Sequence, residues 1–321
     1  MGVLGIDVSK DKLDVVWMDA QRQTQYCQVD NCASGYAKLK HWLGKRQVEA
    51  VCLEATGRYS EGVAAYLHEA GYRVSVVNPA RIRGYATSQL RRNKTDKLDA
   101  ALIADFCRTQ QPEAWTPPPP EVRQLQALVR HLRSLETAKQ QADNRLREAA
   151  ALPDLVVQQL TDQRALLVQH IDHLKQAIQD HIDHFPDLKH QRDLMASIPG
   201  SGKLTAAKLL AECRALTRFD NVRQLVAFAG LNPAHHQSGS SIRKKTTISK
   251  TGNAAIRAAL YMPAVSAKRH NPLLRPFADR LLARGCCEME VITAVMRKLL
   301  HLVYGVLKAD RPFDPNFHLT A

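Results

Sequence analysis

Four acidic residues have the types and spacing needed to act together on a phosphodiester bond. Asp7 ends the apolar run GVLGID and Glu54 ends the apolar run VCLE, while Asp96 and Asp99 lie three residues apart in TDKLDA. On a helix, the last two would share one face. Carboxylates this close repel one another, and bound Mg²⁺, which prefers hard oxygen ligands, removes that cost. Two such ions can activate a nucleophile and stabilise the leaving oxygen at a phosphodiester, so the four residues predict a metal site.

Each acid taken alone has a simpler interpretation. An Asp near a helix start is commonly a cap or a partner of the helix dipole, and Thr95 could supply the cap here. Asp7 and Glu54, however, fall where buried strands are expected, and a buried carboxylate needs a compensating partner. The basic run that directly precedes the last two acids is expected to hold a nucleic-acid backbone, through Arg91, Arg92 and Lys94.

A second group of residues combines small hydroxyl side chains with cations. The segment 238–257 reads SGSSIRKKTTISKTGNAAIR, beginning at Ser238. Its cations could bind a scissile phosphate and stabilise developing charge; they are Arg243, Lys244, Lys245, Lys250 and Arg257. A serine hydroxyl is a poor nucleophile unless another group activates it. No such base can be identified from spacing, so the residues alone favour a phosphate-binding loop over a covalent role.

The hydrophobic pattern predicts the elements that position the four acids. Strands are expected at residues 3–8, 13–19, 24–29, 49–54 and 72–77, and helices at 36–43, 60–70 and about 95–109. Short turns predict antiparallel pairing of the first three strands, and intervening helices predict parallel pairing of the later ones. This order is typical of a ribonuclease-H-type (RNase H) sheet. In such an α/β domain, placed at residues 1–115, the four acids would meet at one edge.

The rest of the chain is predicted to be helical. The run TPPPP at 116–120 is a stiff linker, and leucines and isoleucines at steps of three and four predict a helical or coiled-coil assembly segment at 116–190. Residues 191–321 form a basic, mainly α segment. Its turn at 199–202 has the shape of a helix-hairpin-helix element, which lets backbone approach a phosphate; the alternative is an ordinary turn. The candidate contacts there are Gly200, Gly202 and Lys203.

Composition points to a polyanionic partner. The 321 residues carry a formal charge of +14, and residues 196–321 hold 19 Lys and Arg against 7 Asp and Glu. Nucleic acid is the usual partner of so basic a segment, although a merely soluble basic surface is the alternative. No apolar run approaches the roughly 18 residues of a membrane span, and the first residues do not read as a signal peptide. The seven cysteines form no C-x-x-C pair. We therefore expect no membrane association and a reducing cytoplasm.

Several ordered motifs along nearly the whole chain resemble those of the DEDD transposases of bacterial insertion sequences, which include the Piv-type DNA invertases. The motifs are GIDVSKDKLDV at 5–15, LEATGRY at 53–59, NPARIRGYA at 78–86, RNKTDKLDA at 92–100, SIPGSG at 197–202, FAGLNP at 228–233 and SGSSIR at 238–243.

The resemblance implies a RuvC-like N-terminal domain whose four catalytic, metal-binding acids match Asp7, Glu54, Asp96 and Asp99. The resemblance also implies a C-terminal transposase domain whose nucleophile matches Ser238, the first serine of SGSS. This match reverses the preference against a covalent role for the serine. The expected cofactor is Mg²⁺, with Mn²⁺ as an alternative. The expected partners are donor and target DNA, a structured guide RNA (the bridge RNA of some members) and further copies of the chain in a dimer or tetramer, in which the acids of a neighbouring subunit complete the site.

Two other functions remain open from the sequence. The first is a metal-dependent nuclease of the Holliday-junction-resolvase type, in which activated water cuts DNA and Ser238 only binds phosphate. The second is a non-catalytic nucleic-acid-binding assembly protein, which would show salt-sensitive binding without strand cleavage.

Overall fold

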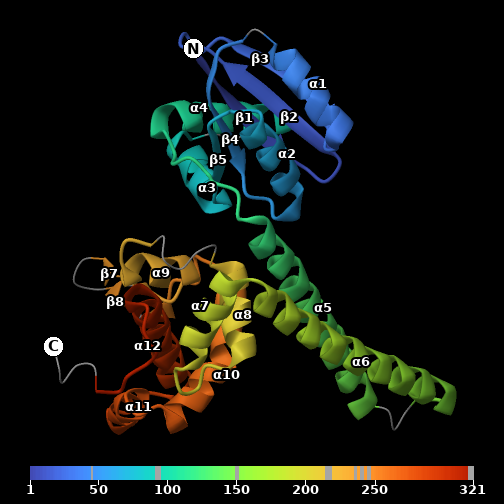
Figure 1. Cartoon of the computed structure of the whole chain (residues 1–321). Helices are drawn as coiled ribbons and strands as arrows, with labels where there is room; N and C mark the ends of the chain where they lie inside the picture. The colour runs from blue at the N-terminus through green and yellow to red at the C-terminus, as the bar shows by residue number, and fades with distance from the viewer. Residues whose placement is uncertain are drawn as a thin grey trace. The chain divides into compact units, whose positions relative to one another are not determined.

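The computed structural model describes residues 1–44, 46–90, 95–148, 152–213, 219–234, 237–238, 242–243 and 247–316. The chain divides into two compact units, Met1–Pro117 and Pro118–Ala321 (Figure 1). The division falls inside the TPPPP run, where successive prolines cannot continue a helix or a sheet ladder. Each unit is built around its own hydrophobic core.

The first unit contains a five-stranded mixed sheet with the order β3-β2-β1-β4-β5. Its strands are β1 (Gly2–Val8), β2 (Lys12–Met18), β3 (Thr24–Asp30), β4 (Val48–Glu54) and β5 (Val74–Val77). β1 pairs antiparallel with β2, and β2 with β3, whereas β1–β4 and β4–β5 are parallel. The predicted α/β sheet, with its strand directions and with β1 at the centre, is confirmed.

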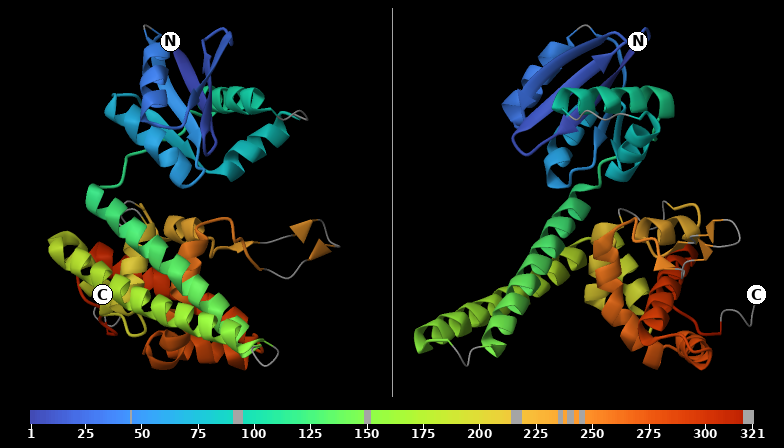
Figure 2. Two further views of the ribbon diagram at one scale, coloured as in Figure 1. Left: turned by 90° about the vertical axis from the view of Figure 1, so that its right-hand side faces the viewer. Right: turned by 180° about the vertical axis from the view of Figure 1, so that it is seen from behind.

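Helices cover both faces of this sheet (Figure 2). α1 (Ala33–Leu43) and α2 (Arg58–Glu69) pack on the face that carries Leu4 and Ile6 of β1. α3 (Pro79–Ser88) and α4 (Asp96–Gln110) pack on the opposite face, which carries Val3. Because successive side chains of a strand alternate between faces, Gly5 and Asp7 share the α4 face with Val3.

α3 is an element that the hydrophobic pattern did not predict. Its apolar content is low, and only Ile82 is buried within it. The local signals for it were nevertheless present in the sequence. Asn78 caps the helix, since its side-chain oxygen accepts a hydrogen bond from the amide of Ala80 at 2.8 Å. Pro79 occupies the first helical position, where its missing N–H has no consequence.

The second unit is mainly helical. Its helices are α5 (Pro120–Arg147), α6 (Asp154–His184), α7 (Pro186–Ala196), α8 (Lys203–Glu212), α9 (Val222–Ala229), α10 (Ala254–His270), α11 (Leu274–Ala283) and α12 (Glu288–Ala309). Its short strands form two antiparallel pairs, β6 (Pro233–Ala234) with β9 (Thr247–Ile248) and β7 (Gln237–Ser238) with β8 (Ile242–Arg243). The helical content of the second unit therefore agrees with the prediction of a mainly α C-terminal region.

α5 and α6 form the predicted helical hairpin, with Leu125, Leu132 and Ile178 buried in the seam. The same residues belong to one continuous core with α7 to α12, and Nε2 of Gln126 donates a buried hydrogen bond to the carbonyl of Ala211 in α8 at 2.7 Å. The structure thus groups the hairpin with the C-terminal helices in one unit. The three-part division at 1–115, 116–190 and 191–321 stays a prediction. In the described part of the chain, no helix is long and apolar enough to cross a membrane.

Candidate active site

Asp7 lies near the end of the central strand, on the face covered by α4. Its neighbour two residues earlier, Gly5, is in close contact with that helix. A Cβ on Gly5 would lie 2.2 Å from the amide nitrogen of Ala104 and 2.3 Å from the carbonyl oxygen of Ala100. Only glycine allows backbone to approach backbone this closely. The glycine therefore lets α4 lie directly over β1.

Glu54 reaches the same face from the neighbouring strand. β1 and β4 are parallel, with Ile6 aligned to Leu53, so the two strands end side by side. Cys52, two residues before Glu54, is buried against α4, and the period of two in a strand puts the carboxylate of Glu54 on that face as well. Asp7 and Glu54 are both partly buried rather than enclosed.

Asp96 and Asp99 lie in the first turn of α4. Thr95 caps this helix, because its hydroxyl oxygen accepts a hydrogen bond from the amide of Leu98 at 3.3 Å. The cap frees the two carboxylates from the capping role that the sequence had left open for Asp96. Asp96 lies one turn before Ala100 and Asp99 directly precedes it, at the N-terminal end of α4. Their spacing puts both acids on one face of the helix.

The electrostatics of Asp7 show that the four acids converge. The pKa of Asp7 is raised from 3.8 to about 6, first by partial burial and then by the nearby charges of Asp99, Glu54, Asp96 and Asp14, in that order. All three elements that carry the predicted acids thus bring negative charge to one strand end. A carboxyl with this pKa retains an appreciable protonated fraction near neutral pH unless a cation is bound.

A fifth carboxylate, which sequence reasoning missed, belongs to this face. Asp14 of β2 is aligned directly with Asp7 across the antiparallel pair, and it is only 4% exposed. Its Oδ1 atom accepts a hydrogen bond from the hydroxyl of Tyr26 at 2.6 Å and another from Nε2 of Gln28 at 3.0 Å. The signal was an aspartate inside the apolar strand LDVVW, but its relation to Asp7 depends on the strand register.

Tyr26 links this fifth carboxylate to the start of α4. The hydrogen bond to Asp14 raises the pKa of Tyr26 to about 12, with a smaller contribution from burial. Nζ of Lys97, which lies between the two acids of α4, is 5.4 Å from the centre of the Tyr26 ring. Strands β2 and β3 therefore brace the helix end that carries Asp96 and Asp99.

The chemistry of the donors fits a hard divalent cation, since carboxylate oxygens are the ligands that Mg²⁺ prefers. The acidic side chains are not arranged as a complete set of metal ligands. Across the residues the structure describes, no three Asp, Glu, His or Cys side chains are already placed to hold one metal ion. The converging charge at Asp7 is the observation that favours a cation here, and small side-chain movements would be needed to close the ligands on it.

The predicted nucleophile lies in the second unit. Ser238 ends β7 and pairs with Ile242 of β8, and Figure 2 shows this ladder projecting from the helices of its own unit. The side chains of Ser238 and Arg243 fall outside what the structure describes, as do Lys244 and Lys245 altogether. The same is true of the basic run Arg91, Arg92 and Lys94 beside the acids.

The remaining predicted contacts show mixed surroundings. Lys250 is exposed, as expected for a residue that meets a phosphate. Arg257, on α10, donates from Nη1 to the carbonyl of Ala229 at 2.8 Å and to that of Gly252 at 3.2 Å. These bonds cap the end of α9, so the observed geometry gives Arg257 a structural role. Contact between Arg257 and nucleic acid stays a prediction.

The turn at 197–202 joins α7 to α8 as the helix-hairpin-helix hypothesis requires. Gly200 has a φ of +99°, and a Cβ there would lie 2.7 Å from that of Ala267. Packing against α10 therefore already explains this glycine. Gly202 and Lys203 are exposed at the start of α8, where free amides and the helix dipole favour an anion.

Comparisons with known proteins show the family to which the chain belongs. A DEDD transposase model of the IS110 type, described as "Transposase", matches residues 4–152. A second model, described as "Transposase IS116/IS110/IS902 family", matches residues 192–279. The chain therefore falls in a class of enzymes that cut and rejoin DNA, the transposases and DNA invertases. Within that class it belongs to the IS110 family of DEDD transposases, which also holds DNA-inverting relatives.

Two similar proteins illustrate the range of this family. The "Pilin gene-inverting protein" of Moraxella bovis is 35% identical over 321 residues, which cover 98% of each chain. The "Transposase for insertion sequence element IS1111A" of Coxiella burnetii is 24% identical, over 84% of this chain and 78% of the relative. Among solved structures, T. thermophilus RuvC in complex with a Holliday junction substrate aligns at 14% identity and a TM-score of 0.27, over 36% of this chain and 100% of that one.

Proposed function

We propose that this transposase cuts and rejoins DNA with two sets of groups: the carboxylates of Asp7, Glu54, Asp96 and Asp99, which bind Mg²⁺ or Mn²⁺, and the hydroxyl of Ser238. The observation that carries the proposal is the convergence of acids from β1, β4 and α4 on one face of the sheet. Partly buried carboxylates from three separate elements have no structural reason to meet there, because their mutual repulsion costs stability.

The acidic site is suited to binding and orienting a phosphodiester. A bound Mg²⁺ would polarise phosphoryl oxygens and stabilise the charge of the leaving oxygen. Asp7 stands on the rigid central strand. Glu54 and the α4 pair approach it from either side, so the chain fixes where a substrate phosphate can bind. Asp14, held by Tyr26 and Gln28, adds a further negative charge opposite Asp7.

Ser238 would supply the nucleophile. Its oxygen attacks the phosphorus of one strand, a serine–phosphate ester forms, and the P–O bond to the departing sugar oxygen breaks, with the serine proton ending on that oxygen. Rejoining reverses the step with the sugar hydroxyl of another strand. Bond count and charge balance at each stage, so no co-reactant is consumed. The support is the position of the serine in the basic segment 238–257 and its match to the SGSS motif.

Trapping the covalent intermediate tests this assignment directly. We expect wild-type protein, incubated with DNA carrying its recombination site and quenched in denaturant, to retain a protease-sensitive protein–DNA adduct. Ser238→Ala should form no adduct while still binding the DNA. If Ser238→Ala recombines normally, or wild type cuts without any adduct, the serine only binds phosphate and the enzyme acts as a metal-dependent nuclease.

Metal binding can be measured apart from activity. We expect titration calorimetry to detect Mn²⁺ binding to wild type and to Asp11→Asn, an exposed acid in the turn after β1, and to detect none with Asp7→Asn or Asp96→Asn. Equal Mn²⁺ binding by Asp7→Asn and wild type would contradict the proposed metal site.

We also propose that a structured guide RNA directs the enzyme and that it works as an oligomer. The basic excess of residues 196–321 supports a nucleic-acid partner, and the long hairpin of α5 and α6 supports assembly. Sequencing the RNA that co-purifies with the protein tests the guide. We expect a single discrete RNA, and random cellular RNA would overturn the proposal of a guide. Light scattering of the purified protein measures the subunit count.

A further inference from the structure

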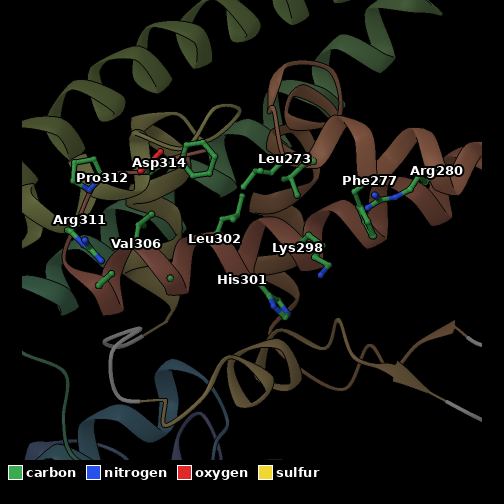
Figure 3. Close-up of a pocket in the computed structure, with 14 residues that line it drawn as sticks. Leu273, Phe277, Arg280, Lys298, His301, Leu302, Val306, Arg311, Pro312 and Asp314 are labelled. Carbon is green, nitrogen blue, oxygen red and sulfur yellow. The ribbon is translucent and has the colours of Figure 1, made fainter. Parts of the chain in front are cut away.

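A groove in the second unit is separate from both the acids and the serine. It lies between α11, α12 and the segment that follows α12 (Figure 3), with a volume of about 610 Å³. This size falls in the range that holds a small organic ligand. Its floor is apolar and includes two aromatic rings, from Phe277 and Phe313, together with Leu302 and Val306.

Positive charge surrounds this apolar floor. Arg280, Lys298 and Arg311 line the groove, against a single carboxylate, Asp314. Nζ of Lys298 lies 5.6 Å from the centre of the Phe277 ring, which places an ammonium group beside an aromatic face. None of the ion pairs found among the described residues involves Arg280 or Lys298. Arg280 and Lys298 are therefore available to an anionic partner.

The local field confirms this sign of charge. His301 of α12 lines the same groove. Burial lowers its pKa, and the neighbouring charges of Lys298 and Arg297 lower it further. The lowered pKa disfavours a positive charge on His301, whose Nε2 atom is buried without a hydrogen-bond partner among the described residues.

An aromatic, apolar floor with a cationic rim matches a nucleobase joined to its phosphate. Bases stack on aromatic side chains, and cations follow the backbone. A purely apolar helix would leave the cations without partners. A second copy of this chain would bring its own net charge of +14 to a positive surface, which like-charge repulsion opposes.

We propose that this groove binds single-stranded DNA, with an unstacked base on the apolar floor and its phosphate at Arg280 and Lys298. The choice of DNA rests on the proposed function, because cutting and exchanging strands exposes unpaired DNA.

Gly305 allows the groove to be filled without a change of charge. It lines the groove within α12, and an added Cβ would meet no atom within 4 Å. Leucine at this position occupies the ligand's space and also favours helix over glycine. Ser266→Leu is the matched control, since Ser266 is exposed on α10 of the same unit and outside the groove.

The measurement is fluorescence anisotropy of the full-length protein with a labelled single-stranded DNA of mixed sequence. We expect Gly305→Leu to weaken binding about tenfold, the effect of losing one stacked base. Ser266→Leu should bind as wild type does. A matching oligonucleotide with abasic positions should bind weakly to wild type and no more weakly to Gly305→Leu. Binding of a duplex should be equal in all three proteins.

A second variant keeps the test valid if leucine disturbs the fold. Arg280→Gln with Lys298→Gln changes only exposed side chains and should weaken single-strand binding and reduce its dependence on salt. Unchanged single-strand binding by both variants would overturn the proposal. So would weakened binding of single-stranded RNA alone, or a changed subunit count with DNA binding intact. Asp7→Asn and Ser238→Ala should keep single-strand binding, so failure of the catalytic proposal gives a different result.

Discussion

Asp7 is held where its ionisation is unfavourable, and this makes its effect on stability depend on pH. The pKa of Asp7 is about 6 in the folded protein against 3.8 for an ordinary Asp. A raised pKa means that the favourable contribution is complete below about pH 3.8 and is lost as the pH rises through about 6. Above that range, the metal-free first unit carries the full cost of the charge.

We therefore predict that Asp7→Asn stabilises the metal-free protein at pH 7. Screening by solvent reduces the gain to about 1 kcal/mol, because Asp7 is only partly buried. Calorimetry in EDTA should show a melting temperature a few degrees above wild type at pH 7 and no difference at pH 4. Asp11→Asn serves as the control and should show neither effect. A gain of the same size at both pH values would contradict the assigned cause.

Tyr26 gives a second prediction at the residue scale. Asp14→Asn keeps an oxygen that can accept from the Tyr26 hydroxyl but removes the charge, so the pKa of Tyr26 should fall from about 12 toward its ordinary value of 10.0. Because the pKa is raised in the folded state, the fold gains stability below pH 10 and loses it as the pH approaches 12. NMR of ring-labelled tyrosine measures this titration, with Tyr26→Phe to assign the signal.

The Tyr85 signal serves as the reference, since its hydroxyl bonds to a different carboxylate, Asp105. An unchanged Tyr26 titration in Asp14→Asn would show that burial, and not Asp14, controls this hydroxyl.

At this scale the sequence predicted more of the acidic site than of its surroundings. Asp7 and Glu54 could be identified because a carboxylate at the end of a buried apolar strand is unusual. Asp14 gave a related signal, a carboxylate inside an apolar strand, but its place beside Asp7 depends on which residue faces Asp7 across the sheet. Register is a property of two strands and cannot be read from either one alone.

Among the elements, α4 packs directly on the central strand and leaves no room for an added methyl group at Gly5. Its backbone touches Gly5, and this contact sets the distance between the α4 acids and Asp7. Gly5→Ala places a methyl group within 2.3 Å of two backbone atoms that cannot rotate away. We predict a loss of about 1–3 kcal/mol in the free energy of unfolding, together with weaker Mn²⁺ binding as α4 is displaced.

Thermal melting and Mn²⁺ titration measure both effects. Gly84→Ala on α3 is the matched control, since a Cβ there meets no atom within 4 Å and alanine favours helix by about 0.5–1 kcal/mol. Equal stability losses in the two variants, or intact Mn²⁺ binding in Gly5→Ala, would show that α4 adapts to the added methyl group.

The elements themselves were predictable to different degrees. Periodic apolar residues identified the five strands and the α5–α6 hairpin, because packing of one face determines those elements. α3 escaped because little of it is buried, so its capping residues, and not its periodicity, define it. The sharing of one core by α5, α6 and the C-terminal helices depends on long-range contacts such as Gln126 to Ala211, which no local pattern encodes.

At the scale of the whole molecule, all four acids lie in the first unit and the serine lies in the second. We predict that mixing Asp7→Asn subunits with Ser238→Ala subunits restores recombination if the acids of one subunit act with the serine of another. Each mixed dimer then has one intact site, which combines the wild-type acids of one subunit with the wild-type serine of the other. We therefore expect a quarter to a half of wild-type activity.

Each variant alone should be inactive, and a strand-transfer assay over a range of mixing ratios measures the recovery. Persistent inactivity at every ratio, with mixed oligomers demonstrated by differential tagging, would mean that acids and serine of the same subunit act together.

The proline run at the unit boundary has a consequence for control of the reaction. Residues 116–120 separate two independently built cores, and the amide of Trp115 is anchored to the carbonyl of Val74 at 2.7 Å. Under the proposed function, each unit carries one of the two sets of catalytic groups, the acids or the serine, and neither unit carries both. A newly made chain would then leave the genome that encodes it uncut until assembly on DNA brings the acids and the serine to one phosphate.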